Sequence, residues 1–174
     1  MNLKKINIIG AIFVIALGTL LHFAYDWSGE SDFVAIFGAV NESTWEHLKL
    51  LFFPVLLFSV VEYFVYGKNV KGFWASKTIA LMVGMLTIIA VFYTYTGVLG
   101  ENVDVVNIML FVTASVLVYY LSYNFMNLEM FENSLLNKVC VLVLVGVFIM
   151  FWVYTFYPPL INLFKDPITS GFGI

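Results

Sequence analysis

Five long apolar stretches constrain this chain more than any other feature of its sequence. A helix needs roughly 20 apolar residues to cross the hydrocarbon core of a bilayer, where every backbone polar group must be hydrogen-bonded internally. The stretches cover about residues 6–25, 45–66, 74–98, 103–123 and 139–157, and Pro158 and Pro159 end the last one. The sequence therefore predicts an all-α, polytopic membrane helix bundle with about five transmembrane helices.

Composition agrees with a lipid environment and excludes several classes of protein. Hydrophobic residues make up 62% of the 174 residues and charged residues only 11%. The net charge of −3 gives no basic surface, so we expect no nucleic-acid binding. The single cysteine, Cys140, excludes an intramolecular disulfide. No internal repeat or flexible linker divides the chain, so residues 1–174 are expected to form one integral-membrane domain.

Lysine placement predicts how the chain is oriented in the cell membrane. Lys4 and Lys5 precede the first stretch, and Lys68, Lys71 and Lys77 lie around the second connection. Loops rich in lysine stay in the cytoplasm. The first stretch lacks a convincing cleavage site, so we interpret it as a retained anchor. We expect the N-terminus inside, and the acidic loop 26–44 and the C-terminus outside.

Polar residues gather at the expected outer ends of the first two helices. His22 and Asp26 are four residues apart and share one helix face, and Gly18, one turn earlier, permits close helix packing. Residues 41–49 add carboxylates, an imidazole and an amine at the start of the second helix. If these helices are antiparallel neighbours, the two sets meet. The candidate ligand or metal residues are His22, Asp26, Asn41, Glu42, Glu46 and His47, and Glu42 and Glu46 are also the candidate catalytic residues.

Two interpretations of this cluster stay open. A divalent metal such as zinc needs three or four nitrogen or oxygen donors at one point. Glu46 and His47 point about 100° apart on a helix, so both do not easily ligate one ion. Alternatively, Ser43 and Glu46 form a capping box, in which Ser43 caps the Glu46 amide and the Glu46 side chain reaches back. No cofactor is certain from the sequence.

Other polar and aromatic residues have expected structural roles. Glu62, near the cytoplasmic end, either snorkels or pairs with Lys68 or Lys71, or it is a proton or cation site within the membrane. Trp27 and Trp45 are typical of an interfacial aromatic belt. The apolar run 33–40 is too short to span, so it lies in the interface or folds back into the protein. The supporting residues of the site are Tyr25, Trp27, Trp45, Lys49, Glu62, Lys165 and Asp166.

The C-terminal tail, residues 158–174, is expected to be ordered. Asp166-Pro167 favours a turn, and Gly171 and Gly173 permit tight backbone. Because the tail emerges on the same side as loop 26–44, Lys165 and the terminal carboxylate could cover the cluster as a lid. The alternative is a tail that packs on the loop for stability alone.

Several strings together resemble a family of small multi-pass bacterial membrane proteins of unknown function. They are His22-Phe-Ala-Tyr-Asp-Trp27, Val40-Asn-Glu-Ser-Thr-Trp-Glu-His-Leu-Lys49, Glu62-Tyr63 and the tail from Tyr157 to Ile174. The resemblance covers nearly the whole chain and implies a membrane location. It implies no chemistry.

Three functions remain open. The first is a carrier or accessory subunit whose outward acidic and histidine cluster binds a cation or small polar ligand. The second is a membrane-embedded, metal-dependent hydrolase of a lipid-like substrate. The third is a purely structural subunit of a membrane complex. The expected partners are the bilayer, a polar ligand, cation or lipid, and a second copy or another membrane protein; whether the chain is an enzyme stays open.

Overall fold

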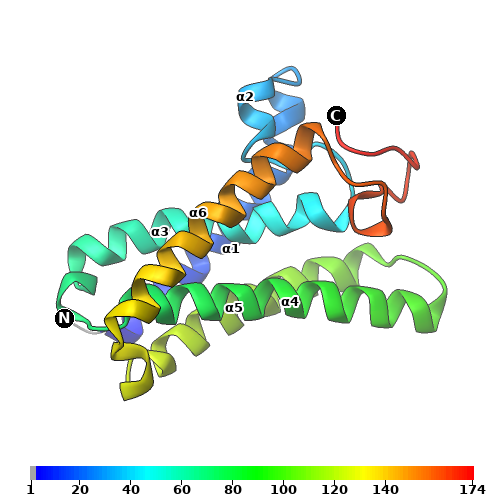
Figure 1. Ribbon diagram of the computed structural model, residues 1–174. Coiled ribbons are helices and arrows are strands. Elements are labelled where there is room, and N and C mark those ends of the chain that lie inside the picture. Colours follow the sequence, from blue (N-terminus) through cyan, green and yellow to red (C-terminus); the bar gives the residue numbers. More distant parts are fainter. Residues whose placement is uncertain (1–2) are drawn as a thin grey trace.

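Five long helices build the chain in the computed structural model, which describes residues 3–174 (Figure 1). The prediction of an all-helical fold is confirmed, and the described part contains no strand. Each of the five is long and apolar enough to cross a membrane. They are α1 (Leu3–Trp27), α3 (Thr44–Val65), α4 (Phe73–Leu99), α5 (Asp104–Phe125) and α6 (Ser134–Phe156); a short helix, α2 (Asp32–Ala35), follows α1.

The last helix differs most from its predicted bounds. It begins at Ser134 rather than near Val139, because the Asn133 side chain accepts hydrogen bonds from the amides of Leu135 and Leu136. Such a cap satisfies amides that lack a partner within the helix. The polar first turn of α6 lies outside the apolar stretch, so a prediction from hydropathy alone places the start of the helix too late.

Helix α3 lies inside the bundle and contacts each of the other four long helices. Gly18 of α1 makes one of these contacts close, because a Cβ there would lie 2.5 Å from the Leu50 carbonyl oxygen of α3. Phe52 and Leu51 of α3 are fully buried. In contrast, α1, α5 and α6 expose many large apolar side chains, among them Ile8, Ile108 and Leu142. Exposed apolar surface of this extent fits a lipid environment.

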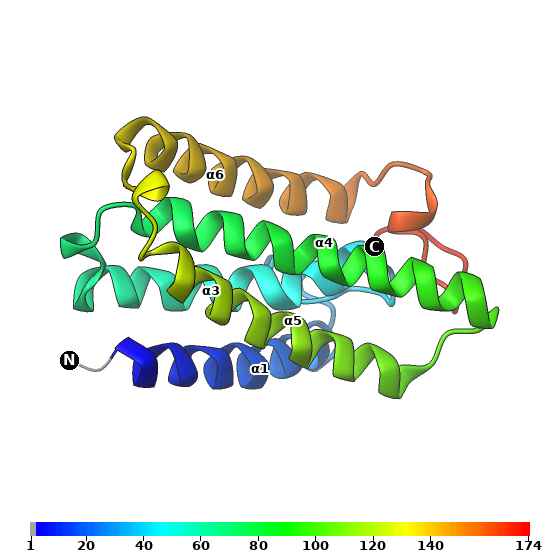
Figure 2. The ribbon, with the colours of Figure 1, turned by 90° about the horizontal axis from the view of Figure 1, so that it is seen from below.

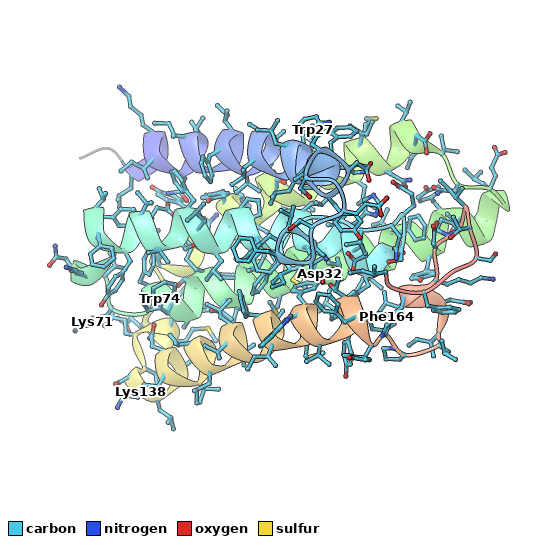
Figure 3. All side chains as sticks on the ribbon, turned by 90° about the horizontal axis from the view of Figure 1, so that it is seen from above. Trp27, Asp32, Lys71, Trp74, Lys138 and Phe164 are labelled. Carbon is cyan, nitrogen blue, oxygen red and sulfur yellow. The ribbon has the colours of Figure 1, made fainter. Side chains whose placement is uncertain are left out.

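The two ends of the bundle carry different segments (Figure 2). One end holds the start of α1 and the α3–α4 and α5–α6 connections; we call it the lysine end after Lys5, Lys68, Lys71 and Lys138. The opposite end holds the α1–α3 loop, the α4–α5 turn and the tail, and we call it the histidine end after His22 and His47. Figure 3 shows Trp27 and Phe164 toward the histidine end, and Lys71 and Lys138 at the lysine end.

The α1–α3 loop folds back against the helices. Ala35 in α2 is fully buried, and the Phe37 ring lies 5.1 Å from the Phe53 ring of α3. Gly38 approaches α1 so closely that a Cβ would lie 2.9 Å from the Leu21 carbonyl oxygen. The loop thereby brings Asn41 and Glu42 onto the first turn of α3.

Candidate functional site

Two histidines and one glutamate converge at the histidine end. His22 comes from α1, His47 from the second turn of α3, and Glu42 from the loop between them. The Glu42 carboxylate lies between the imidazoles, 3.7 Å from His22 Nε2 and 3.4 Å from His47 Nε2. One ligand atom from each of the three residues lies within 4.8 Å of the other two. We call His22, Glu42 and His47 the histidine cluster.

The backbone fixes the proton position on His47. Its Nδ1 lies 2.9 Å from the Ser43 carbonyl oxygen, one turn earlier in α3. A carbonyl oxygen only accepts hydrogen bonds, so Nδ1 carries a hydrogen and donates it. The Nε2 atom, which faces Glu42, is therefore the nitrogen that can bind a proton or a metal. Metal-binding histidines commonly have their other ring nitrogen anchored in this way.

His22 is less constrained than His47. Its Nδ1 atom is buried and has no hydrogen-bond partner within residues 3–174. Its ring lies 5.1 Å from the His47 ring in an edge-on arrangement. The His22 and His47 side chains are 30% and 29% exposed and Glu42 is 42% exposed, so the cluster is open to solution.

The loop that presents Glu42 is tied to the tail. The Asn41 side chain accepts a hydrogen bond from the Ser43 amide and donates one to the Gly173 carbonyl oxygen. A Cβ on Gly173 would lie 2.8 Å from the Thr155 carbonyl oxygen, so the tail packs tightly on the end of α6. The Asn41 side chain thus links the loop to the tail.

Glu46 lies apart from the cluster and pairs with Lys49. The two charged groups are 2.5 Å apart, and both side chains are almost completely buried. The Val40 amide and the Thr155 hydroxyl donate to the Glu46 carboxylate, and the Lys49 ammonium donates to the Ala35 carbonyl oxygen and to Thr155. This Glu46–Lys49 pair joins the α1–α3 loop, α3 and α6.

The capping box is only half formed. Ser43 is the N-cap of α3, and its hydroxyl accepts a hydrogen bond from the Glu46 amide, as predicted. The expectation that the Glu46 side chain reaches back to the Ser43 amide was wrong, because Asn41 binds that amide instead. The capping pattern did not anticipate that Lys49 would be buried beside Glu46.

Several candidates near the cluster lie outside it. Asp26 is exposed at the end of α1, and Trp27 is 69% exposed and stacks on Phe23. Tyr25 is buried, with 7% of its surface exposed. The expectation that Trp45 lies in an interfacial belt was wrong: it is 6% exposed and packs on Phe151 and Phe164.

The tail is ordered, but its charged residues do not cover the cluster by ion pairing. Asp166 is buried and accepts hydrogen bonds from the Ile168 amide and the Thr169 hydroxyl, which closes a turn. Lys165 is exposed, its backbone pairs with Phe172, and it forms no ion pair with Glu42 or Glu46 in the described chain.

A second buried ion pair lies toward the lysine end. Glu62 of α3 is 2.6 Å from Lys77 of α4, and both are almost fully buried. The expected partners were wrong: Lys71 lies near Glu132, and Lys68 lies over the Phe64 ring. Lys77 was predicted only to orient the chain in the membrane, although its position one turn into an apolar stretch also indicated burial.

Tyr66, just past the end of α3, completes this second pair. Its hydroxyl donates a hydrogen bond of 2.8 Å to Glu62. Burial, and then the negative charge of Glu62, raise the pKa of Tyr66 above its ordinary value. The phenol therefore stays protonated and remains a donor to the carboxylate.

The histidine cluster has the donor set of an open metal site. A tetrahedral zinc ion with bonds of about 2.0–2.1 Å holds its ligand atoms about 3.4 Å apart. His22 Nε2 lies 3.7 Å from one Glu42 oxygen and His47 Nε2 lies 3.4 Å from the other, and one donor atom from each of the three residues lies within 4.8 Å of the other two. Two imidazole nitrogens and one carboxylate oxygen leave a fourth position for water or another ligand.

Comparisons with known proteins identify a family without an assigned activity. The model of a family described as "Family of unknown function (DUF6512)" matches residues 1–174. Comparison with curated proteins and with solved structures finds no match.

Proposed function

Because the chain belongs to this family of unknown function, we propose its function from the site itself. The protein is a multi-pass cell-membrane protein that binds one divalent transition-metal cation at an outward-facing histidine cluster. It acts as a metal-binding accessory subunit. The observation that carries the proposal is the convergence of His22, Glu42 and His47 from two helices and the loop between them.

The chemistry of the three donors supports a transition metal over a hard cation. Imidazole nitrogen binds zinc, copper and nickel well, whereas calcium and magnesium prefer sites made of oxygen ligands. His47 already has its Nδ1 anchored on the Ser43 carbonyl, so its Nε2 is oriented before a metal arrives. Pre-orientation lowers the entropic cost of binding.

The competing interpretation is an ion pair that ties helices together. Protonated histidines on both sides of Glu42 would hold α1 and α3 to the loop without a metal. Such partly exposed pairs contribute little, commonly about 0–1 kcal/mol.

Charge distribution supports the outward orientation. The exposed lysines Lys68, Lys71 and Lys138 lie at the lysine end. At the histidine end, Lys165 is the one exposed lysine within residues 3–174. Segments rich in lysine stay on the cytoplasmic side, so the histidine end faces out.

Packing below the cluster supports a binding role over a carrier. Leu51, Phe52 and Val55 of α3 are at most 1% exposed and fill the bundle below the cluster. A hydrolase has less support, because Glu46, one of two candidate bases, is held in its ion pair with Lys49. Glu42, the other, is itself a proposed metal ligand.

Metal analysis of the purified protein tests the proposal. After chelator washing and reloading with Zn²⁺ in detergent, we expect about one bound zinc ion per wild-type chain, measured by mass spectrometry of the elements. His22→Ala, His47→Ala and Glu42→Gln each remove a donor, so each should lose most of the bound zinc. Binding should also weaken as the pH falls, because protons compete for the imidazole nitrogens.

Glu101→Gln is the matched control. Glu101 is an exposed acid at the same end of the bundle but belongs to the α4–α5 turn. This variant should retain wild-type zinc. No zinc in the wild type, or equal loss in Glu101→Gln and Glu42→Gln, would overturn the proposal.

A further inference from the structure

A buried ion pair with few hydrogen bonds lies toward the lysine end. Glu62 Oε2 and Lys77 Nζ are 2.6 Å apart, and the two side chains are at most 2% exposed. Beyond that contact, Glu62 accepts one hydrogen bond, from Tyr66, and the Lys77 ammonium has no hydrogen-bond partner in the described chain. The hydroxyls of Ser59 and Tyr119 are buried without a partner as well. Such atoms are rare in folded proteins and call for an explanation.

The other buried pair on α3 provides a comparison. Besides their mutual contact, Glu46 accepts two hydrogen bonds and Lys49 donates two, all to partners in the folded loop or in α6. A buried charge is tolerated where a close partner and further hydrogen bonds compensate for the lost water. The Glu62–Lys77 pair lacks most of these bonds, so the charged form of Glu62 is less strongly held.

The space beside the Glu62–Lys77 pair admits no larger ligand. Ser59 and Lys77 line a crevice that is otherwise bounded by apolar side chains, among them Leu144 of α6 and Trp74, which lies toward the lysine end (Figure 3). The crevice has no volume that would hold a water molecule, which needs at least about 10–15 Å³. A proton needs no such space. Ionisable groups within a membrane span commonly belong to proton or ion sites.

Lys77 has contacts that stabilise its charge independently of Glu62. Its Nζ lies 4.4 Å from the centroid of the Tyr119 ring and 6.0 Å from that of the Phe73 ring. The face of an aromatic ring attracts a cation, and more strongly where water is excluded. The Ser59 hydroxyl, which lines the same crevice, has lone pairs that can accept from the ammonium. The Glu62 carboxylate is therefore the member of the pair whose protonation can change.

Tyr66 connects the pair to the surface at the lysine end. It follows the last residue of α3, donates its hydroxyl hydrogen to Glu62, and is itself followed by the exposed Lys68 and Asn69. A phenol can pass a proton on, because its oxygen accepts one while its own hydrogen is donated. In the opposite direction, the apolar Val55 and its neighbours on α3 are at most 1% exposed. The pair is therefore reached from the lysine end.

Glu62 is the one carboxylate on the helices that pack around it at this depth. The lysines of α1 are exposed at its start, and the buried Asn7 that follows them is uncharged. The titratable groups that face the pair from α3 and the turn after it, α4, α5 and α6 are Tyr63, Tyr66, Lys68, Lys77, Tyr119 and Cys140.

We propose that the Glu62–Lys77 pair is a proton-binding site within the membrane. The Glu62 carboxylate takes up one proton, which reaches it from the lysine end past Tyr66, and becomes a neutral carboxylic acid. Lys77 keeps its charge over the Tyr119 ring, so the net charge of the pair rises by one. The site is separate from the histidine cluster and does not require a metal there.

Infrared difference spectroscopy of the full-length protein in detergent tests this proposal, because a carboxylic acid has a C=O stretching band that a carboxylate lacks. We expect this band to appear in the folded protein as the pH is lowered, and to be lost in Glu62→Gln. After transfer to heavy water, the band shifts as deuterium replaces the proton. Tyr66→Phe should slow that shift, and an unchanged rate would overturn the route past Tyr66.

Glu132→Gln is the matched control, because Glu132 is a half-exposed acid at the same end of the bundle. This variant should retain the band. Absence of an acid band in the folded wild type, or a band that survives Glu62→Gln, overturns the proposal and leaves a structural ion pair. If Glu62→Gln does not fold, Glu62→Asp keeps the acid. In protein labelled with ¹³C-glutamate, that substitution should move the band to the unlabelled frequency, and a band that stays at the labelled frequency also overturns the proposal.

Discussion

Glu46 and Glu62 are buried carboxylates on the same helix, and each has a lysine within 2.6 Å. Moving a charge out of water costs several kcal/mol, so a buried ion is tolerated only with a close partner and further hydrogen bonds. Glu46 has the more complete set, since Lys49, Val40 and Thr155 all contact its carboxylate. At the scale of residues, these pairs connect segments that are far apart in the chain.

Removing one member of the Glu46–Lys49 pair should destabilise the protein strongly. Lys49→Met leaves the Glu46 charge buried without compensation, so we expect the free energy of unfolding to fall by about 3–5 kcal/mol. Unfolding by titration with a denaturing detergent, followed by tryptophan fluorescence, measures the change. The double variant Glu46→Gln/Lys49→Met should recover much of the loss.

Lys71→Met is the control for this prediction. Lys71 lies 3.4 Å from Glu132, but the two side chains are 79% and 48% exposed. An exposed pair contributes at most about 1 kcal/mol, so the free energy of unfolding should change little. If Lys49→Met lowers the free energy of unfolding no more than Lys71→Met does, the buried pair does not contribute strongly to stability.

Helix packing at the scale of elements depends on two glycines of α1. A Cβ at Gly10 would lie 2.3 Å from the Tyr119 ring of α5, and one at Gly18 would lie 2.5 Å from the Leu50 carbonyl oxygen of α3. Small residues let helix backbones approach closely in membranes, where dispersion contacts supply much of the association energy. These glycines therefore set how close α1 lies to its neighbours and hence where His22 is placed.

Gly18→Ala should loosen the contact between α1 and α3. The added methyl group meets backbone, which cannot rotate away, so we expect a loss of about 1–3 kcal/mol in the free energy of unfolding. Gly146→Ala in α6 is the matched control, because a Cβ there meets nothing within 4 Å. That variant should be neutral or more stable by up to about 1 kcal/mol. Equal effects of the two substitutions would contradict the close contact.

The whole molecule is asymmetric between its lysine end and its histidine end. We propose from this asymmetry that the histidine end faces outward. In a Cys140→Ala background, Asp26→Cys should react with a membrane-impermeant maleimide added to intact cells. Asn69→Cys, at the lysine end, should react only after the membrane is opened; both positions are exposed. The reverse labelling pattern would invert the orientation.

The sequence by itself determined the class of fold and the number of long helices. Backbone polar groups in lipid have no water to bind, so each apolar stretch of sufficient length must form a helix, whatever its neighbours are. The Ser43 cap of α3 was likewise predictable from the sequence, because a cap involves only residues within one turn. The turn of the tail that begins at Asp166 was also predicted from neighbouring residues.

Only the tertiary structure decided which polar residues meet. Among the candidates, His22, Glu42 and His47 come together, while Asp26 stays at the surface and Glu46 turns inward to Lys49. The pairing of Glu62 with Lys77, the burial of Trp45 and the placement of the tail above Thr44 likewise depend on contacts between distant segments. Adjacent positions on a helix face different neighbours, and the neighbours are set by how the five helices pack. The energies of burial and pairing that fix these contacts are therefore properties of the assembled bundle.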